Sequence, residues 1–303
     1  MAALASLEAS VRILEKKNFN LNVSMARRKK GLDKFMEYPL ASLSQWYCLA
    51  PENRYPIQLL DCVTAAIYFM KTAEDYGMDP AHVVIGGDSA GGNLAATACQ
   101  ALAHRRDISK LRAQGLIYPG LQGLDLNLPS YQQNQSVPFL FQETVAMLGL
   151  RGFGYSMSFK DCLLEGPHVP MDMKLKYRKW IHADNIPKEF KVRGHTPKSP
   201  SSFSLESYGI TRTLLSPAFS PLTADEGTIC LLPKPCIITC EYDVFRDDGL
   251  LYKKRLEDNG IKVTWYHIEN GSTEVYGFFG YRLFSFPSGE KVLNHTIHFI
   301  KDL

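Results

Sequence analysis

The serine at position 89 lies in the stretch GGDSAGG, residues 86–92, between the apolar run HVVI and the alanine-rich run NLAATACQALA. Residues 87–91 fit the pattern G-x-S-x-G, in which a serine occupies a strained turn between a strand and a helix, and the glycines permit a close crossing of the chain. The flanking runs supply the expected strand and helix, so the pattern predicts a nucleophilic serine. The alternative is a glycine-rich turn whose serine only caps the helix.

A serine hydroxyl is a weak nucleophile at neutral pH, so it requires a general base and a carboxylate that orients this base. In proteins with this turn the chain order is serine, acid, histidine. Asp243 directly follows the apolar segment PCIITCE, at the carboxyl end of a predicted strand, where open α/β sheets place their chemistry. We therefore predict that Asp243 is the acid. A helix-capping role is the alternative, and it suits Asp247 and Asp248 better because they open the next predicted helix.

The expected place for the base holds no histidine. The loop after the last predicted strand has the sequence IENGSTEVYG. His267 lies within the preceding strand, about six residues or ~20 Å before the required position, so we predict that it is an ordinary strand residue. Surface or packing roles are predicted for the others, which are His82, His104, His168, His182, His195, His295 and His298.

The elements around these residues alternate between strand and helix. The patterns predict a helix over 56–76, a strand over 82–85, a helix over 89–104 and a strand over 113–119. Strands over 235–241 and 261–269 and helices over 247–260 and 289–303 follow later in the chain. This order predicts an α/β fold, with a mainly parallel sheet flanked by helices.

Two segments depart from this alternation. Residues 120–215 contain proline, polar and aromatic stretches without clear strands, which predicts a lid-like insertion. Residues 1–45 begin with an amphipathic helical pattern and continue as irregular polar sequence. We therefore divide the chain into a divergent N-terminal segment, 1–45, and one domain over 46–303 that carries the insertion.

Composition excludes several classes of function. The 303 residues are 45% hydrophobic, which is enough for one large core, and the net charge of +3 predicts no nucleic-acid partner. The seven cysteines form no C-x-x-C pair and have no zinc-ligand spacing. The glycine-rich turn lacks the lysine of a phosphate-binding loop. We expect no metal, nucleotide or redox cofactor, and no apolar run reaches the roughly 18 residues of a membrane span.

Several sequence blocks together resemble a known family. They are YCLAPENRYPIQLLDC, GDSAGGNLAA, GLIYPGLQGLDLNLPSYQQN, LLSPAFSPL and ITCEYDVFRDDGLLYKKRLEDNGIKVTWYHIENG. From about Tyr47 to Leu303 the chain resembles the arylacetamide deacetylase-like group of the hormone-sensitive-lipase branch of the α/β hydrolases. The resemblance implies an α/β-hydrolase fold with a helical lid, Ser89 as the nucleophile, Asp243 as the orienting acid, and the amide of Ala90 as an oxyanion donor.

The resemblance also implies a substrate class and a location. Such proteins are serine esterases of the endoplasmic-reticulum membrane that face the lumen and act on small hydrophobic acyl esters and acetamides. We therefore expect a ligand of this kind and a location at the endoplasmic-reticulum membrane or lumen. The cytoplasm stays open as an alternative, because the sequence contains no anchor-like segment.

The departures from the family bear on activity. Thr273 stands where the family has its histidine, two residues after Gly271, and nothing before Leu49 resembles the family's H-G-G-G oxyanion block. We therefore predict a carboxylic-ester hydrolase by class whose turnover is weak or absent. One alternative is a non-catalytic protein that binds lipid-like ligands or regulates. Another is a chain that folds poorly because strands are missing.

Overall fold

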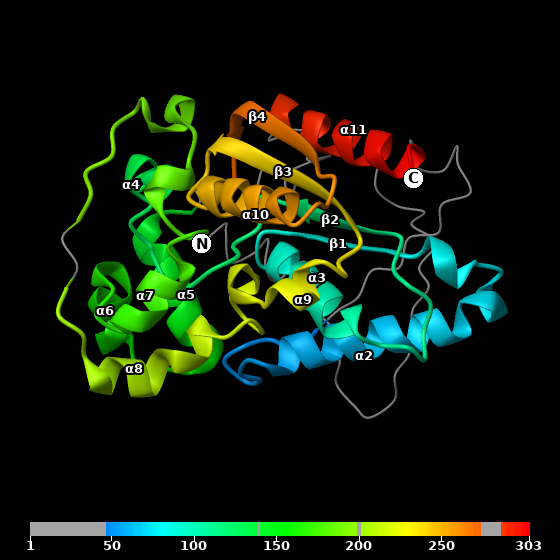
Figure 1. Cartoon of the computed structure of the whole chain (residues 1–303), viewed down its shortest axis with the longest axis horizontal. Coiled ribbons are helices and arrows are strands. Elements are labelled where there is room, and N and C mark those ends of the chain that lie inside the picture. The colour runs from blue at the N-terminus through cyan, green and yellow to red at the C-terminus, as the bar shows by residue number, and fades with distance from the viewer. Residues whose placement is uncertain (1–46, 139, 199–200, 274–285) are drawn as a thin grey trace.

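A computed structural model describes residues 47–303 except 139, 199–200 and 274–285. Four parallel strands form its sheet in the order β1-β2-β3-β4 (Figure 1). They are β1 (Val84–Asp88), β2 (Ala113–Ile117), β3 (Lys234–Tyr242) and β4 (Thr264–Ser272). The predicted α/β fold with a parallel sheet is confirmed.

Helices cover both faces of this sheet (Figure 1). Leu116 and Ile237 face the core that contains α3 (Ala90–Ala103) and α10 (Arg246–Asp258). The next residue of each strand faces the opposite core, which includes α11 (Pro287–Lys301). Successive side chains of a strand point to opposite faces, so strands buried on both faces are apolar throughout. The outer helix α2 (Ile57–Thr72) packs against α3.

Local signals set the ends of these elements, and several of the predicted limits are corrected. The helical segment that begins with α2 ends at Gly77, whose φ of 70° is left-handed, as predicted. Strand β1 begins at Val84 and not at His82, because Pro80–His82 forms a 3₁₀ turn capped by Asp79. Strand β4 runs from Thr264 to Ser272, so it begins and ends three residues later than the predicted 261–269. Strand β2 ends at Ile117 and not at residue 119.

Between β2 and β3 the described chain contains helices and no strand. The helices α4 to α8 gather at one end of the molecule (Figure 1). They are α4 (Pro129–Gln133), α5 (Gln142–Phe153), α6 (Lys160–Glu165), α7 (Met171–Tyr177) and α8 (Leu205–Thr211), and α9 (Glu226–Ile229) follows them. The limits 120–215 of the insertion stay a prediction. The N-terminal segment 1–45 and the comparison with the H-G-G-G block lie outside the described residues.

Asp247 and Asp248 tie this insertion to α10. The Oδ2 atom of Asp248 accepts the backbone N–H of Leu121 at 2.8 Å, and Oδ2 of Asp247 accepts that of Ser130 at 2.7 Å. Both carboxyls are fully buried. The cap position of α10 is occupied by Phe245, and no side chain caps the helix. The prediction that the two aspartates cap this helix is therefore wrong. They satisfy amides of the insertion, because a buried carboxyl requires hydrogen-bond donors.

Within the described residues, no helix has both the length and the apolar character needed to cross a membrane.

The variant Asp248→Asn tests how this buried carboxyl affects stability. An unfolded aspartate titrates near pH ~4, whereas burial raises the pKa of Asp248 to about 8 in the folded protein. The protonated form is therefore favoured by folding, so its contribution is complete below about pH 4 and is lost as the pH rises through about 8. Urea denaturation across this range should show a steeper loss of stability in the unmodified protein than in Asp248→Asn. Parallel curves would contradict the prediction.

Candidate active site

Ser89 lies at the junction of β1 and α3 in a strained conformation. Its φ and ψ are 53° and −117°, and Ser89 and Tyr118 are the non-glycine residues with positive φ in the described chain. The backbone N–H of Ser89 donates to the carbonyl of Ile117 at 2.9 Å. The Ser89 side chain makes no capping hydrogen bond to α3. The alternative of a helix-capping serine is therefore wrong, and strain of this kind is typical of a functional turn.

Glycine is required at position 87 because the chain crosses itself there. A Cβ atom on Gly87 would lie 2.3 Å from the carbonyl oxygen of Gly91. No side chain can move away to relieve this contact, since both partners are backbone. The glycine thus permits α3 to start directly after the end of β1, with Ser89 at the turn between them.

We expect Gly87→Ala to destabilise the protein by about 3 kcal/mol, because either the strand or the helix must shift. Gly149→Ala is the matched control. It lies within α5, where an added Cβ meets nothing within 4 Å, and it should stabilise the helix by up to about 1 kcal/mol. Urea denaturation midpoints measure both. Equal midpoints for the two variants would show that the crossing is not tight.

Asp243 and Thr273 are brought together at the carboxyl ends of β3 and β4. The Oδ1 atom of Asp243 accepts the Thr273 hydroxyl at 2.5 Å and the backbone N–H of Phe245 at 3.0 Å. Both side chains are buried, Asp243 at 0% and Thr273 at 1% exposure. Ser89 also lies at the carboxyl end of its strand, β1, which is separated from β3 by β2. The hydroxyl of Thr273 thus occupies a position beside the predicted acid.

Ala90 is the first residue of α3 and is exposed. The first amides of a helix have no carbonyl partner within the helix and carry a partial positive charge. The location is suited to the oxyanion donor that the resemblance implies.

All eight histidines lie in the described residues, and no hydrogen bond joins any of them to Ser89. His267 faces the Thr239 hydroxyl through Nδ1 at 3.0 Å and Glu241 through Nε2 at 3.3 Å. It is a strand residue with its own partners, as predicted. His168 lies 3.0 Å from the carbonyl of Gly123, and burial lowers its pKa.

Other histidines also have local partners. His82, His182 and His298 each lie within 3.4 Å of an aspartate close by in sequence, His104 contacts Thr228, and His295 stacks on Tyr266.

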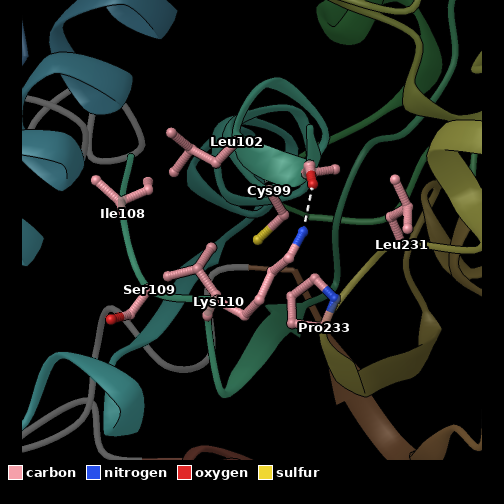
Figure 2. Close-up of a pocket in the computed structure, with 9 residues that line it drawn as sticks. Cys99, Leu102, Ile108, Ser109, Lys110, Leu231 and Pro233 are labelled. Carbon is pink, nitrogen blue, oxygen red and sulfur yellow. Dashed lines mark hydrogen bonds between the residues drawn. The ribbon is translucent and has the colours of Figure 1, made fainter. Parts of the chain in front are cut away.

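Figure 2 shows a small cavity lined by residues from the C-terminal part of α3, among them Cys99 and Leu102. Its volume is about 30 Å³, and Lys110 crosses it to donate to the carbonyl of Ala103 at 2.8 Å. Ser89 precedes the first turn of α3, so the helix separates it from this cavity by roughly 15 to 20 Å. The cavity has room for about one water molecule. It is too far from Ser89 to bind a substrate that this serine could reach.

The sequence patterns did not reveal a polar stripe on α3 that bonds the chain where the predicted insertion begins and just after it ends. The amide of Asn93 donates to the carbonyls of Gly120 and Phe219, each at 2.7 Å, and that of Gln100 donates to Pro221 at 2.9 Å. The signal was present in the sequence, because Asn93 and Gln100 are seven residues apart in a helix whose only other polar side chain is that of Thr97. This spacing places both on one helix face.

These features are those of an α/β hydrolase fold with a strained serine at the turn between β1 and α3. The sequence profile of a family described as having the alpha/beta hydrolase fold matches residues 37–151 and 187–276. The chain belongs to this family. Among solved structures, it is similar to a fungal esterase from Rhizomucor miehei, with a TM-score of 0.59 and 22% identity over 84% of this chain and 61% of that one. At this identity the likeness shows the fold alone.

The predicted kinship with the arylacetamide deacetylase-like group is also confirmed. The chain is 43% identical over 257 residues to human arylacetamide deacetylase-like 4, covering 85% of this chain and 63% of the relative. It is 38% identical over 249 residues to bovine arylacetamide deacetylase, covering 79% of this chain and 62% of the relative. The chain therefore spans about three fifths of the length of these curated relatives.

Proposed function

We propose that this chain is a carboxylic-ester hydrolase by class whose site lacks the general base. Its turnover of esters is then close to that of a Ser89→Ala variant. The observation that carries the proposal is the 2.5 Å hydrogen bond from Thr273 Oγ1 to Asp243 Oδ1. In a serine triad the acid bonds an imidazole that faces the nucleophile. Here the predicted acid bonds an alcohol.

A threonine hydroxyl does not accept a proton near neutral pH, so it cannot activate Ser89. Removal of one member of a serine triad lowers turnover by roughly 10⁴- to 10⁶-fold. The features that support residual chemistry are the strained turn at the half-buried Ser89 and the amide of the exposed Ala90 at the start of α3. Donors of this kind stabilise an oxyanion but leave only slow hydrolysis when the base is absent. The proposal rests on Thr273 and not on residues before position 47.

The ligand that we propose is a small hydrophobic acyl ester or acetamide. Its carbonyl carbon faces the Ser89 hydroxyl, and its carbonyl oxygen accepts the backbone N–H of Ala90. Family membership supports ester substrates, and the names of the relatives describe a deacetylase of arylacetamides. A location at the endoplasmic reticulum, expected from the resemblance, belongs to the same proposal. If turnover is absent altogether, the site is one for binding such ligands without hydrolysis.

Hydrolysis of p-nitrophenyl butyrate tests the proposal directly. We expect the unmodified protein to match Ser89→Ala, and Thr273→His to exceed both by at least about 100-fold, because the introduced imidazole adjoins Asp243. The double variant Ser89→Ala/Thr273→His is the control and should return to the base level. A rate for the unmodified protein far above that of Ser89→Ala would refute the loss of the base.

Fluorophosphonate labelling measures activation of the serine independently of turnover. The reagent modifies an activated serine, so we expect slow labelling of the unmodified protein and much faster labelling of Thr273→His. Mass spectrometry of the labelled peptide should place the adduct on Ser89. Rapid labelling of the unmodified protein at Ser89 would mean that another group activates this serine.

A further inference from the structure

Two side chains of the insertion hold the turn that carries Asp243. The amide nitrogen of Asn134 donates to the backbone carbonyls of Asp243 at 2.9 Å and Glu241 at 3.2 Å. The hydroxyl of Ser130 donates to the carbonyl of Val244 at 2.6 Å. The backbone on both sides of the predicted acid is therefore bonded to α4 and the residue that ends it.

Burial and a third side chain, that of Arg193, hold Ser130 and Asn134 in place. Ser130 and Asn134 are four residues apart on one face of the helical turn, and both are fully buried. The Oδ1 atom of Asn134 accepts Nη1 of Arg193 at 2.9 Å, which directs the amide nitrogen of Asn134 toward the two carbonyls. Buried hydrogen bonds of this kind are costly to leave unmade, so each one restrains the backbone strongly.

The sheet by itself does not hold this turn. The pairing of β3 with β4 shifts register between Cys240 and Tyr242, and the last paired residue of β3 is Tyr242. Beyond it, the Asp243 carbonyl also accepts the N–H of Arg246 at 3.2 Å, within the same turn. The bonds from Ser130 and Asn134 come instead from a separate part of the fold, so they fix where the turn lies.

We propose that Ser130 and Asn134 are positioning residues that set the direction of the Asp243 carboxylate. This inference rests on the proposed function, in which Asp243 is the acid that faces position 273. A carboxylate orients and stabilises its partner imidazole only from the correct place, and a displacement of about 1 Å in such a site can cost about 100-fold in rate. The insertion thus sets the direction of the Asp243 carboxylate in addition to packing against the sheet domain.

The experiment uses the full chain with Thr273→His, and follows the introduced imidazole by NMR as the pH is varied. A carboxylate in contact raises the pKa of an imidazole above its ordinary value of about 6.5, by about one unit here. We expect Asn134→Ala or Ser130→Ala, added to Thr273→His, to lower this pKa by at least about half a unit, a threefold change in the protonation equilibrium.

Gln133→Ala in the same background is the matched control. Gln133 also lies on α4 and donates to the carbonyls of Phe190 at 3.1 Å and Gly194 at 3.0 Å. Neither carbonyl belongs to the turn that carries Asp243. Its loss should leave the imidazole pKa unchanged. If Asn134→Ala does not melt cooperatively, Ser130→Ala decides alone, because it removes a single oxygen atom.

Three results would overturn the inference. They are an equal shift in the Gln133→Ala control, no shift in a folded Ser130→Ala or Asn134→Ala variant, and an ordinary imidazole pKa in Thr273→His itself. The NMR titration does not depend on turnover. If Thr273→His hydrolyses no ester while its imidazole pKa still responds to Ser130 and Asn134, the proposed function is contradicted and the positioning role stays in place.

Discussion

Three carboxyls are buried within six residues of one another after β3, and the surrounding structure is arranged to satisfy them. Asp243 is bonded by Thr273, Asp247 by Ser130, and Asp248 by Leu121. A buried carboxyl without donors is strongly unfavourable, so each of these contacts requires another element to lie in one place. The end of β4, the helix α4 and the chain after β2 all meet at this segment for that reason.

The same segment connects fold and site. Asp243 and the two aspartates of α10 are close in sequence, so the contacts that fix the insertion also fix the turn of the predicted acid. Arg246 is fully buried between them and bonds both Asp247 and Glu241 at 2.9 Å. Buried hydrogen-bond networks of this kind make the surrounding structure rigid. The hydroxyl of Thr273 belongs to the same set of contacts, because it donates to Asp243 at 2.5 Å.

The strained serine persists for a separate physical reason. Its conformation follows from the crossing of β1 and α3 at Gly87 and from the bond between Ser89 and Ile117. Neither feature involves position 273. The conformation of Ser89 therefore depends on contacts that do not include Thr273.

Much of the fold was predictable because its signals are local. Apolar runs buried on both faces marked β2 and β3, Gly77 marked the end of the helical segment after α2, and the pattern around Ser89 marked the crossing. The predicted start of β1 at His82 was wrong, because the cap by Asp79 favours a turn over continued strand. The end of β4 was also placed too early, since its last residues pair with β3 despite polar sequence.

The sequence by itself determined the class of fold, the identity of the residues at the turn, and the absence of a histidine at position 273. These follow from residue types and their spacing along the chain. Only the tertiary structure decided what Thr273 bonds, why Asp247 and Asp248 are buried, and how Ser130 and Asn134 reach the acid. Such partners lie more than one hundred residues from Asp243 or its neighbours, or on a different strand, and no periodicity in the sequence encodes a contact of that kind.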